Sequence, residues 1–425
     1  MASALADDEV AAAPSALRTV FASPLYRGAT VSLFLSGLGV SAAAPQITLF
    51  LVDDLHTSLT TAGLYYLTNI TAPLAGYLIG TRSDRSGKRL GLFRACAVAA
   101  AVGWFGMAAS NQVWMPFVIS ALVLAFAGAA GSQLFAELHD SLQETADTVG
   151  TAGDGVVSIV RMALTAGWIV GPVLGSLLAA TAGPRVMLGA TGLCTLAQIF
   201  PMGFARTART ARTAKTARTT HVRARPDTQT EHVRRRPGLR AMLPLLAFTG
   251  LYCFVYAGEP IKYGYLTIYM RTDLHLPTAV SGAVIAIQPL IELILMPVAV
   301  IAARRIGMMR LMIVGAGCGV GANLCFALTG NTAGMFAGQI LMGGVWGVFA
   351  ALGIIVAQRL LPEAVATASA IFMTSPAIAS ALGGVTGGLG VNLLGLPHVF
   401  LLPAVFGLVA TAGFAVMSRS RHAVA

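Results

Sequence analysis

Charged residues are scarce in this chain of 425 residues. Only 11% are Asp, Glu, Lys or Arg, whereas 56% are hydrophobic and a further 47 residues are Gly. A soluble domain carries roughly 25% charged residues, and no soluble chain of this length can hide so much apolar surface from water. The composition therefore excludes a soluble protein, a disordered chain and a DNA-binding module, and it predicts an integral membrane protein.

Cysteines and catalytic motifs are also few. The five Cys lie in apolar stretches without a C-x-x-C pair, which predicts small buried side chains rather than disulfides or a zinc site. The seven His are too scattered for a metal site, and the sequence has no P-loop, G-x-S-x-G or H-E-x-x-H motif. We therefore expect no enzyme, no cofactor and no ATP hydrolysis, which leaves ion or substrate gradients as the energy source.

Long apolar runs are abundant instead. A membrane-spanning helix needs about 20 mostly apolar residues, and these runs do not alternate as membrane strands do. Twelve runs predict an all-α membrane protein, in an N-terminal six-helix half (28–204) and a C-terminal six-helix half (241–417). The expected spans are 28–52, 59–80, 90–110, 113–136, 154–180, 186–204, 241–264, 277–303, 310–330, 333–357, 364–390 and 396–417.

The basic residues predict the orientation of these spans. With both ends on one side, nearly all Lys and Arg fall on that side, which the positive-inside rule makes cytoplasmic. We therefore expect a multi-pass protein of the cell (inner) membrane with cytoplasmic tails at 1–27 and 418–425. The basic linker 205–240 is interpreted as a solvated cytoplasmic segment, with anionic lipid as the alternative partner. No nucleic-acid partner is expected, since the linker lacks aromatic residues.

A polar loop follows the second span. It reads Gly80-Thr-Arg-Ser-Asp84-Arg85-Ser-Gly87-Lys88-Arg89, with two glycines for a tight turn and four basic residues. This loop resembles the one between spans two and three of the major facilitator superfamily, where it latches the two halves together in one state. The resemblance implies the major facilitator fold and a gating role for Asp84 and Arg85. The alternative is an ordinary positive-inside loop.

The fifth span contains closely spaced glycines. Gly167, Gly171, Pro172 and Gly175 match G-x-x-x-G-P-x-x-G, in which glycines four apart let helices approach and the proline bends the helix. The pattern resembles a motif of proton-coupled exporters in the same superfamily, and so favours efflux. The alternative is ordinary packing between membrane helices.

Several short matches point to one branch of that superfamily. They are Ala44-Pro45-x-x-Thr48, Leu64-Tyr65-Tyr66-x-x-Asn69, Gln133-Leu134-Phe135-Ala136, Arg161 seven residues before Trp168, and Glu292 fifteen residues after Pro277. Together they resemble the bacterial sugar efflux transporters. The resemblance implies a secondary transporter that exports sugars or related small molecules, with protons as the counter-ion. The alternatives are a proton-coupled multidrug exporter and, less favoured, a membrane sensor that does not transport.

Few ionisable residues lie inside the expected spans. Placing a charged side chain there costs about 2.5–3.5 kcal/mol of insertion free energy, so each such residue is a candidate for a functional role. The candidates for proton coupling are Glu292, Arg161 and Glu259. Burial disfavours a charged carboxylate and a nearby cation favours it, so we expect Glu292 to carry the proton. Spans five and eight are neighbours in the superfamily, which implies Arg161 as its partner. A static Arg161–Glu292 pair is the alternative.

Candidate sugar-binding residues are amides, carboxylates and aromatic rings. Glu259 and Lys262 share a helix face, and Pro260 between them predicts a broken helix of the kind that often forms binding sites. The expected binding set is Gln46, Asn69, Gln133, Trp168, Glu259, Lys262, Tyr263, Gln288 and Gln339. Spans one, four, seven and ten line the cavity in the superfamily, which favours Gln46, Gln133, Glu259 and Gln339. The alternative for Glu259 and Lys262 is an ion pair at the extracellular end of a helix, and for the other residues it is packing or a hydrogen bond between helices.

Overall fold

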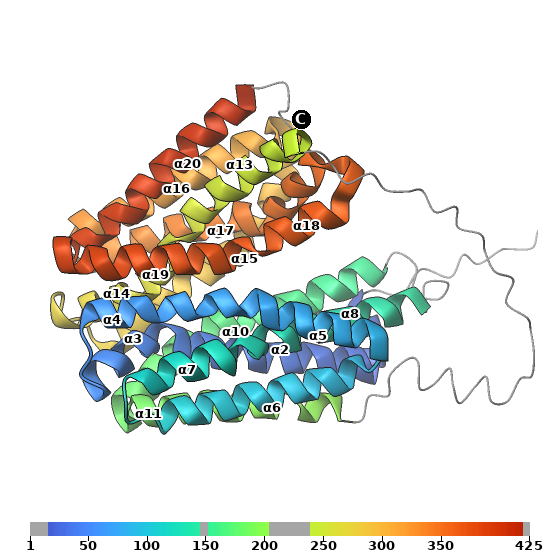
Figure 1. Ribbon diagram of the computed structural model, residues 1–425, viewed down its shortest axis with the longest axis horizontal. Helices are drawn as coiled ribbons and strands as arrows, with labels where there is room; N and C mark the ends of the chain where they lie inside the picture. Colours follow the sequence, from blue (N-terminus) through green and yellow to red (C-terminus); the bar gives the residue numbers. More distant parts are fainter. Residues whose placement is uncertain (1–15, 145–151, 204–238, 420–425) are drawn as a thin grey trace, which may run out of the picture.

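The computed structural model describes residues 16–144, 152–203 and 239–419, and every regular element in these ranges is a helix (Figure 1). Nearly all of the expected linker and the end of the C-terminal tail lie outside the described residues, so those interpretations stay predictions. Residues 16–22, expected within the N-terminal tail, form a short helix.

The first half of the chain contains long helices with short 3-10 or π turns inside them. Pro45 lies in one such turn, because a proline has no N–H to continue the α-helical bonding. The elements are α1 (Ala16–Ala22), α2 (Pro24–Ala43), η1 (Ala44–Gln46), α3 (Ile47–Leu49), η2 (Phe50–Asp54), α4 (Leu59–Leu64), η3 (Tyr65–Thr71), α5 (Ala72–Ser86), α6 (Arg89–Ala108), α7 (Trp114–Leu122), η4 (Leu124–Phe126), α8 (Ala127–Glu144), α10 (Ala152–Ala182), α11 (Pro184–Ala197) and η5 (Phe200–Met202).

The second half is built in the same way. Its elements are α13 (Leu239–Tyr256), α14 (Gly258–Thr272), α15 (Thr278–Ile306), α16 (Met308–Leu328), α17 (Thr332–Leu360), η6 (Pro362–Ala364), α18 (Val365–Met373), α19 (Ser375–Leu394), η7 (His398–Phe400) and α20 (Leu401–Arg419). The expected span 241–264 is broken, but at Ala257 between α13 and α14 rather than at Pro260, which lies within the first turn of α14. The break puts Glu259 in the first turn of α14, where the helix dipole favours a negative charge.

Ten helical stretches among the described residues are long and apolar enough to cross a membrane. This confirms an all-α, multi-pass membrane protein, but it does not confirm twelve spans. The expected span 59–80 corresponds to α4, η3 and α5, and 186–204 to α11 and η5. Neither is among the ten, and α11 has only 14 residues.

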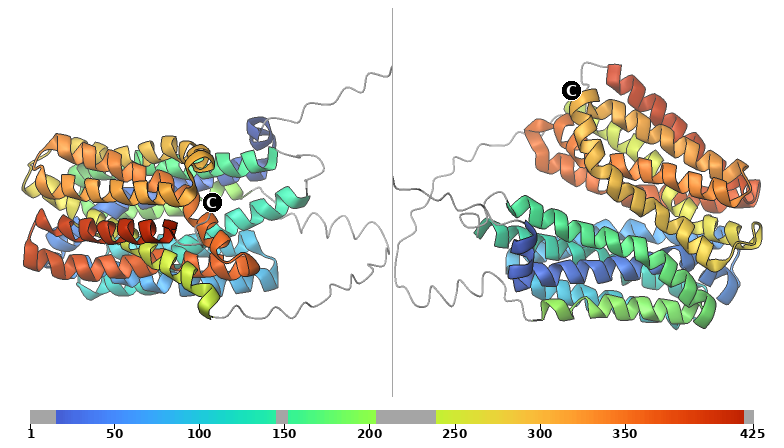
Figure 2. Two further views of the ribbon diagram at one scale, coloured as in Figure 1. Left: turned by 90° about the horizontal axis from the view of Figure 1, so that it is seen from above. Right: turned by 180° about the vertical axis from the view of Figure 1, so that it is seen from behind.

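The two halves form two bundles that meet at one end and diverge toward the other (Figures 1 and 2). At the meeting end, α19 packs against α4 and η3, and α14 packs against α3 and α4. We call this the closed end. In between, α10 of the first half packs against α15 of the second, so the expected contact between spans five and eight is confirmed.

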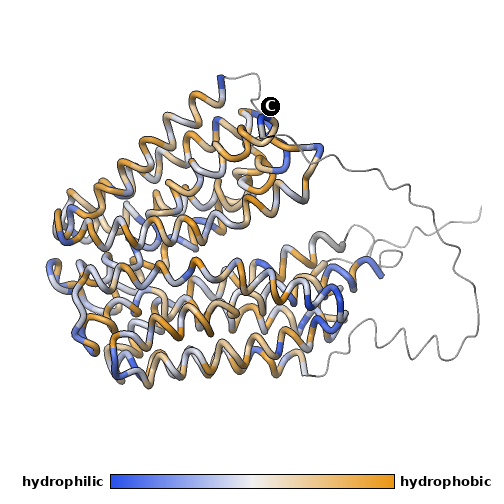
Figure 3. The backbone as a smooth tube through the Cα atoms, viewed as in Figure 1, coloured by the Kyte–Doolittle hydropathy of each residue, from blue (hydrophilic) through white to orange (hydrophobic). Residues whose placement is uncertain are grey.

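The opposite end, here the linker end, includes the α5–α6, α15–α16 and α17–α18 turns (Figure 1). Hydrophilic residues gather at both ends of the molecule, and the middle is mostly hydrophobic (Figure 3). The basic residues near the three linker-end turns include Arg85, Lys88, Arg304 and Arg359. The core is therefore a membrane-sized apolar layer with a basic end.

Candidate functional site

A cavity of about 1010 Å³ lies between the two halves, with α10 on one side and α14, α15 and α17 on the other. Among the described residues on its wall, only three side chains are charged: Arg161 on α10, Glu259 on α14 and Glu292 on α15. All three proton-coupling candidates therefore face the central space, as the sequence predicted, rather than the lipid surface.

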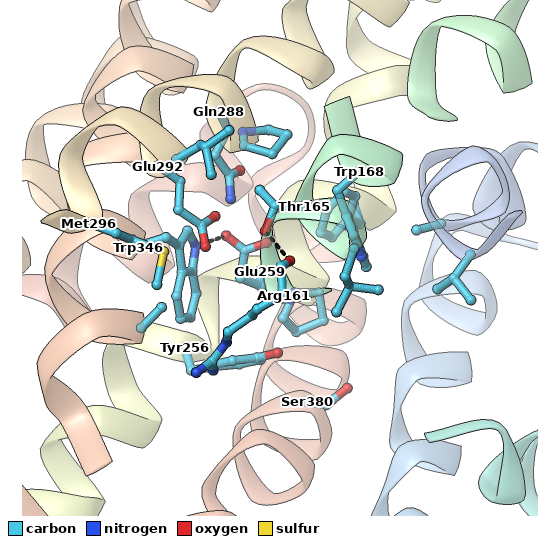
Figure 4. Close-up of a pocket in the computed structure, with 18 of the residues that line it drawn as sticks. Arg161, Thr165, Trp168, Tyr256, Glu259, Gln288, Glu292, Met296, Trp346 and Ser380 are labelled. Atoms are coloured by element: carbon cyan, nitrogen blue, oxygen red, sulfur yellow. Dashed lines mark hydrogen bonds between the residues drawn. The ribbon is translucent and has the colours of Figure 1, made fainter. Parts of the chain in front are cut away.

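The Glu259 carboxylate is held by a buried network. Lys262, fully buried on the next turn of α14, donates to both carboxylate oxygens at 2.9 and 2.8 Å. The indole Nε1 of Trp346 on α17 donates to Glu259 Oε1 at 2.5 Å (Figure 4). Lys262 also donates to Gln288 Oε1 on α15. Three helices of the second half therefore meet at one ion pair, in which Glu259 lines the cavity and Lys262 does not.

Glu292 is in a different environment, although it lies on the same wall. Within the described part of the chain, its carboxylate accepts no hydrogen bond and forms no ion pair. The guanidinium of Arg161 points toward Tyr256 and away from Glu292 (Figure 4). The expected Arg161–Glu292 pair is therefore not formed in this conformation, and their partnership stays a prediction.

Aromatic rings cover much of the remaining wall. Trp168 on α10 and Tyr263 on α14 face each other across the two halves, with ring centroids 6.4 Å apart. Tyr256 and Trp346 form an edge-on pair at 4.9 Å. The Lys262 ammonium lies 4.3 Å from the centroid of the Tyr263 ring, a cation–π distance. The wall thus combines flat apolar faces with a few polar groups, as pockets for small molecules do.

Five of the predicted binding residues line the cavity: Asn69, Trp168, Glu259, Tyr263 and Gln288. The Asn69 side chain already has a protein partner, because its Nδ2 donates a hydrogen bond to Ser380 Oγ of the other half at 2.8 Å. Lys262 does not line the cavity itself but contacts three residues that do, Glu259, Gln288 and Tyr263.

Three of the predicted amides do not line this cavity, and their contact with a ligand stays a prediction. Gln46 Nε2 donates to Ser176 Oγ at 2.9 Å, and Ser83 Oγ donates to Gln133 Oε1 at 2.5 Å. Gln339 is fully buried, and neither of its amide atoms has a partner among the described residues. Gln46 and Gln133 each bond to a neighbouring helix, and the rotation of a helix about its axis cannot be predicted from hydropathy.

Sequence reasoning missed other wall residues. Tyr256 and Trp346 contribute aromatic faces, and Ser158 and Thr165 contribute hydroxyls on α10. Trp346 is flanked by glycines in the stretch Gly343-Gly344-Val345-Trp346-Gly347. A lone indole among small residues of a membrane helix is the signal that could have identified it.

Comparison with known proteins identifies the family to which this chain belongs. The sequence matches the Major Facilitator Superfamily over residues 29–384. The chain belongs to the major facilitator superfamily. Sugar efflux transporter A of Escherichia coli (strain K12) is 24% identical over 393 residues, covering 91% of this chain and 94% of that protein. Sugar efflux transporter A of Dickeya chrysanthemi is 23% identical over 361 residues, or 84% and 87% of the two chains.

The fold agrees with this membership. The crystal structure of the nucleoside transporter NupG superimposes with a TM-score of 0.74 at 16% identity, covering 93% of this chain and 100% of that one. As a member of the major facilitator superfamily, the chain is a multi-pass membrane transporter and not an enzyme.

The loop that resembles the superfamily's gating loop forms hydrogen bonds and ion pairs with residues of its own half. Gly87 ends α5 with a φ of 63°, a left-handed conformation that favours glycine. Arg89 Nε donates to Asp140 Oδ2 on α8 at 2.6 Å, and Arg89 lies 3.8 Å from Asp84. None of these contacts crosses to the second half, so the gating role of Asp84 and Arg85 stays a prediction.

The glycine motif of α10, residues 167–175, packs against α2. A Cβ on Gly171 would be 2.6 Å from the Leu38 carbonyl oxygen, and one on Gly175 would be 2.5 Å from that of Ala42. Gly167 lies on the same face of α10, and Pro172 is inside the helix. The glycines therefore serve close helix packing, and a role in antiport stays a prediction.

Proposed function

We propose that this chain exports sugars or related small polar molecules by proton antiport with alternating access. The observation that carries the proposal is the cavity between the halves, where carboxylate, amide and aromatic side chains converge. Hydroxyl groups bond well to such carboxylates and amides, and a sugar ring offers an apolar face to aromatic rings. The similarity to proteins named sugar efflux transporters supports the same substrate class.

Alternating access needs one end closed while the cavity reaches the other. At the closed end, Arg271 forms a two-pronged ion pair with Asp53 across the halves, and Tyr265 Oη donates to the Leu59 carbonyl oxygen at 3.2 Å. The cavity wall extends toward the linker end through Ser158 and Ile355. With the basic linker end in the cytoplasm, this is the state that takes up cytoplasmic substrate.

Glu292 is the proposed proton carrier. It faces the cavity without a hydrogen-bond or ion-pair partner among the described residues, whereas Glu259 is occupied by Lys262 and Trp346. A dry, closed cavity favours the neutral carboxyl, and approach of the Arg161 guanidinium favours the carboxylate. In one state of the cycle water is excluded from Glu292, and the carboxyl group binds a proton. In the other state Arg161 approaches Glu292, and the carboxyl group releases that proton, so one proton moves per cycle.

The test is uptake of labelled sugars into inside-out vesicles, with and without an imposed proton gradient. We expect the gradient to accelerate accumulation, and unlabelled glycosides to compete with it. Competition by lipophilic cations but not by glycosides would support the multidrug exporter, which remains the alternative function. No gradient dependence with any labelled sugar would contradict proton antiport.

A further inference from the structure

The charges around the cavity balance. Its wall carries Arg161, Glu259 and Glu292, and Lys262 lies directly behind it. With all four groups ionised the net charge is zero, and with Glu292 protonated it becomes positive. A buried charge without a counter-charge is costly in a low-dielectric space. Glu259 is paired with Lys262, and Glu292 is the wall carboxylate without a partner among the described residues, so a cationic ligand finds no unpaired carboxylate here once Glu292 is protonated.

Lys262 is the residue on which this balance depends. Its side chain is fully buried, and its ammonium contacts two Glu259 oxygens, the Gln288 oxygen and the Tyr263 ring. A buried ion pair seldom adds stability over apolar packing, and a pair inside a membrane protein is more costly still. Its presence beside the cavity points to a role in ligand recognition.

We propose that Lys262 is a positioning residue that neutralises Glu259 and makes the cavity selective for uncharged, hydroxyl-rich ligands. The proposal rests on the proposed function, since it concerns the same cavity. Under this proposal, Glu259 accepts hydrogen bonds from the ligand and stays paired with Lys262 throughout transport. Glu292 is then the single wall carboxylate whose charge changes during transport.

The geometry also fixes what Gln288 offers to a ligand. An ammonium group only donates hydrogen bonds, so the amide oxygen of Gln288 must face Lys262. The amide nitrogen is then the group left for the cavity, which Gln288 lines. A paired carboxylate and a fixed amide donor on neighbouring helices suit a ligand with adjacent hydroxyls, each of which donates and accepts.

The experiment measures equilibrium binding to the purified full-length protein without a proton gradient. The probes are labelled lactose, maltose and methyl α-D-glucoside, with tetraphenylphosphonium as the lipophilic cation. Because no gradient is used, a failure of proton antiport in vesicles leaves these binding constants unaffected, and the two proposals fail separately. We expect the wild-type protein to bind at least one sugar more tightly than the cation.

Lys262→Met removes the positive charge and leaves Glu259 unpaired. We expect sugar affinity to fall about tenfold, as for loss of a hydrogen bond to a charged group, and cation affinity to rise at least tenfold. Arg310→Met, an exposed charge removal on α16, is the matched control and should change neither. Improper folding alone would not create a new affinity for the cation.

The double variant Glu259→Gln/Lys262→Met carries no unpaired charge at this position. It therefore keeps the proposal testable even if the single variant does not fold. It should bind sugar about tenfold more weakly than wild type but gain no cation affinity. The proposal is overturned if the cation binds the wild type more tightly than every sugar tested. It is also overturned if Lys262→Met, or the double variant, keeps wild-type sugar affinity.

Discussion

At the residue scale, the Glu259 carboxylate joins helices that are distant in the sequence. Lys262 is three residues away on α14, whereas Trp346 lies on α17 and donates its indole N–H at 2.5 Å. Trp346 is also packed edge-on against Tyr256 of α13. One acidic side chain therefore fixes the position of an aromatic ring that forms the cavity wall.

Trp346→Phe tests this connection, because it keeps an aromatic ring and removes the N–H donor to Glu259, together with part of the buried volume of the indole. We expect a loss of about 1.5–3 kcal/mol in stability, the range for hydrogen bonds to charged groups. Thermal unfolding can be followed with a thiol-reactive dye, since all five cysteines are free and at least partly buried.

Trp114→Phe is the control for that variant, since Trp114 is 62% exposed on α7. Its unfolding temperature should match the wild type. Equal unfolding temperatures for the Trp346 and Trp114 variants would show that the indole–carboxylate bond contributes nothing.

The sequence predicted the Glu259–Lys262 pair but not its wider network. A spacing of three residues places two side chains on one helix face whatever the tertiary structure. The partners on α15 and α17 depend on how three helices pack, which no local pattern encodes. For the same reason, the sequence could not show that Gln46 and Gln133 bond to neighbouring helices, or that Gln339 is fully buried away from this cavity.

At the element scale, the contact between α10 and α2 depends on the absence of side chains. Gly171 and Gly175 bring the two helix backbones together. The spacing predicted close packing correctly, since glycines four residues apart form a groove on any helix. It did not identify α2 as the partner.

Gly171→Ala should therefore destabilise the first half. The new Cβ would be 2.6 Å from the Leu38 carbonyl oxygen and would also meet Ser41 Oγ. Overpacking of this kind typically costs about 1–3 kcal/mol, which the thiol-reactive dye would report as a lower unfolding temperature.

Gly317→Ala on α16 is the matched control. No atom lies within 4 Å of its Cβ position, and alanine is the better helix former by about 0.5–1 kcal/mol. We expect an unchanged or slightly higher unfolding temperature. Destabilisation of both variants to the same extent would argue against a special role for the α10–α2 contact.

At the scale of the whole molecule, the two halves are joined across the closed end by residues far apart in the sequence. Asp53 lies in η2 at the end of the first long apolar stretch, Pro24–Asp54, and Arg271 lies in the last turn of α14. Gly388 of α19 approaches the α4 backbone, where a Cβ would lie 2.9 Å from the Thr60 carbonyl oxygen. The composition and the basic residues were enough to predict two helical halves and a basic end. The closed-end contacts could not be predicted, because they exist in one conformation of the transport cycle.

Arg271→Gln should shift the molecule toward the state that opens at the closed end. Exposed ion pairs contribute at most about 1 kcal/mol, so we expect a population change of up to about fivefold. Distances between spin labels at Gln112 and Leu393, both exposed, would report a larger fraction of open molecules.

The exchanged pair Asp53→Arg/Arg271→Asp should restore the wild-type distance distribution, since it reverses the charges and keeps their attraction. A distribution that stays shifted in the exchanged protein would mean that the ion pair does not hold this end closed.

The most direct test of the account is proton-driven transport by Glu292→Gln in inside-out vesicles, compared with sugar exchange in the same vesicles without a gradient. We predict that accumulation driven by the proton gradient is lost, while exchange of labelled for unlabelled sugar continues, because the cavity remains but its proton carrier is gone. Undiminished gradient-driven accumulation in this variant would contradict the central claim.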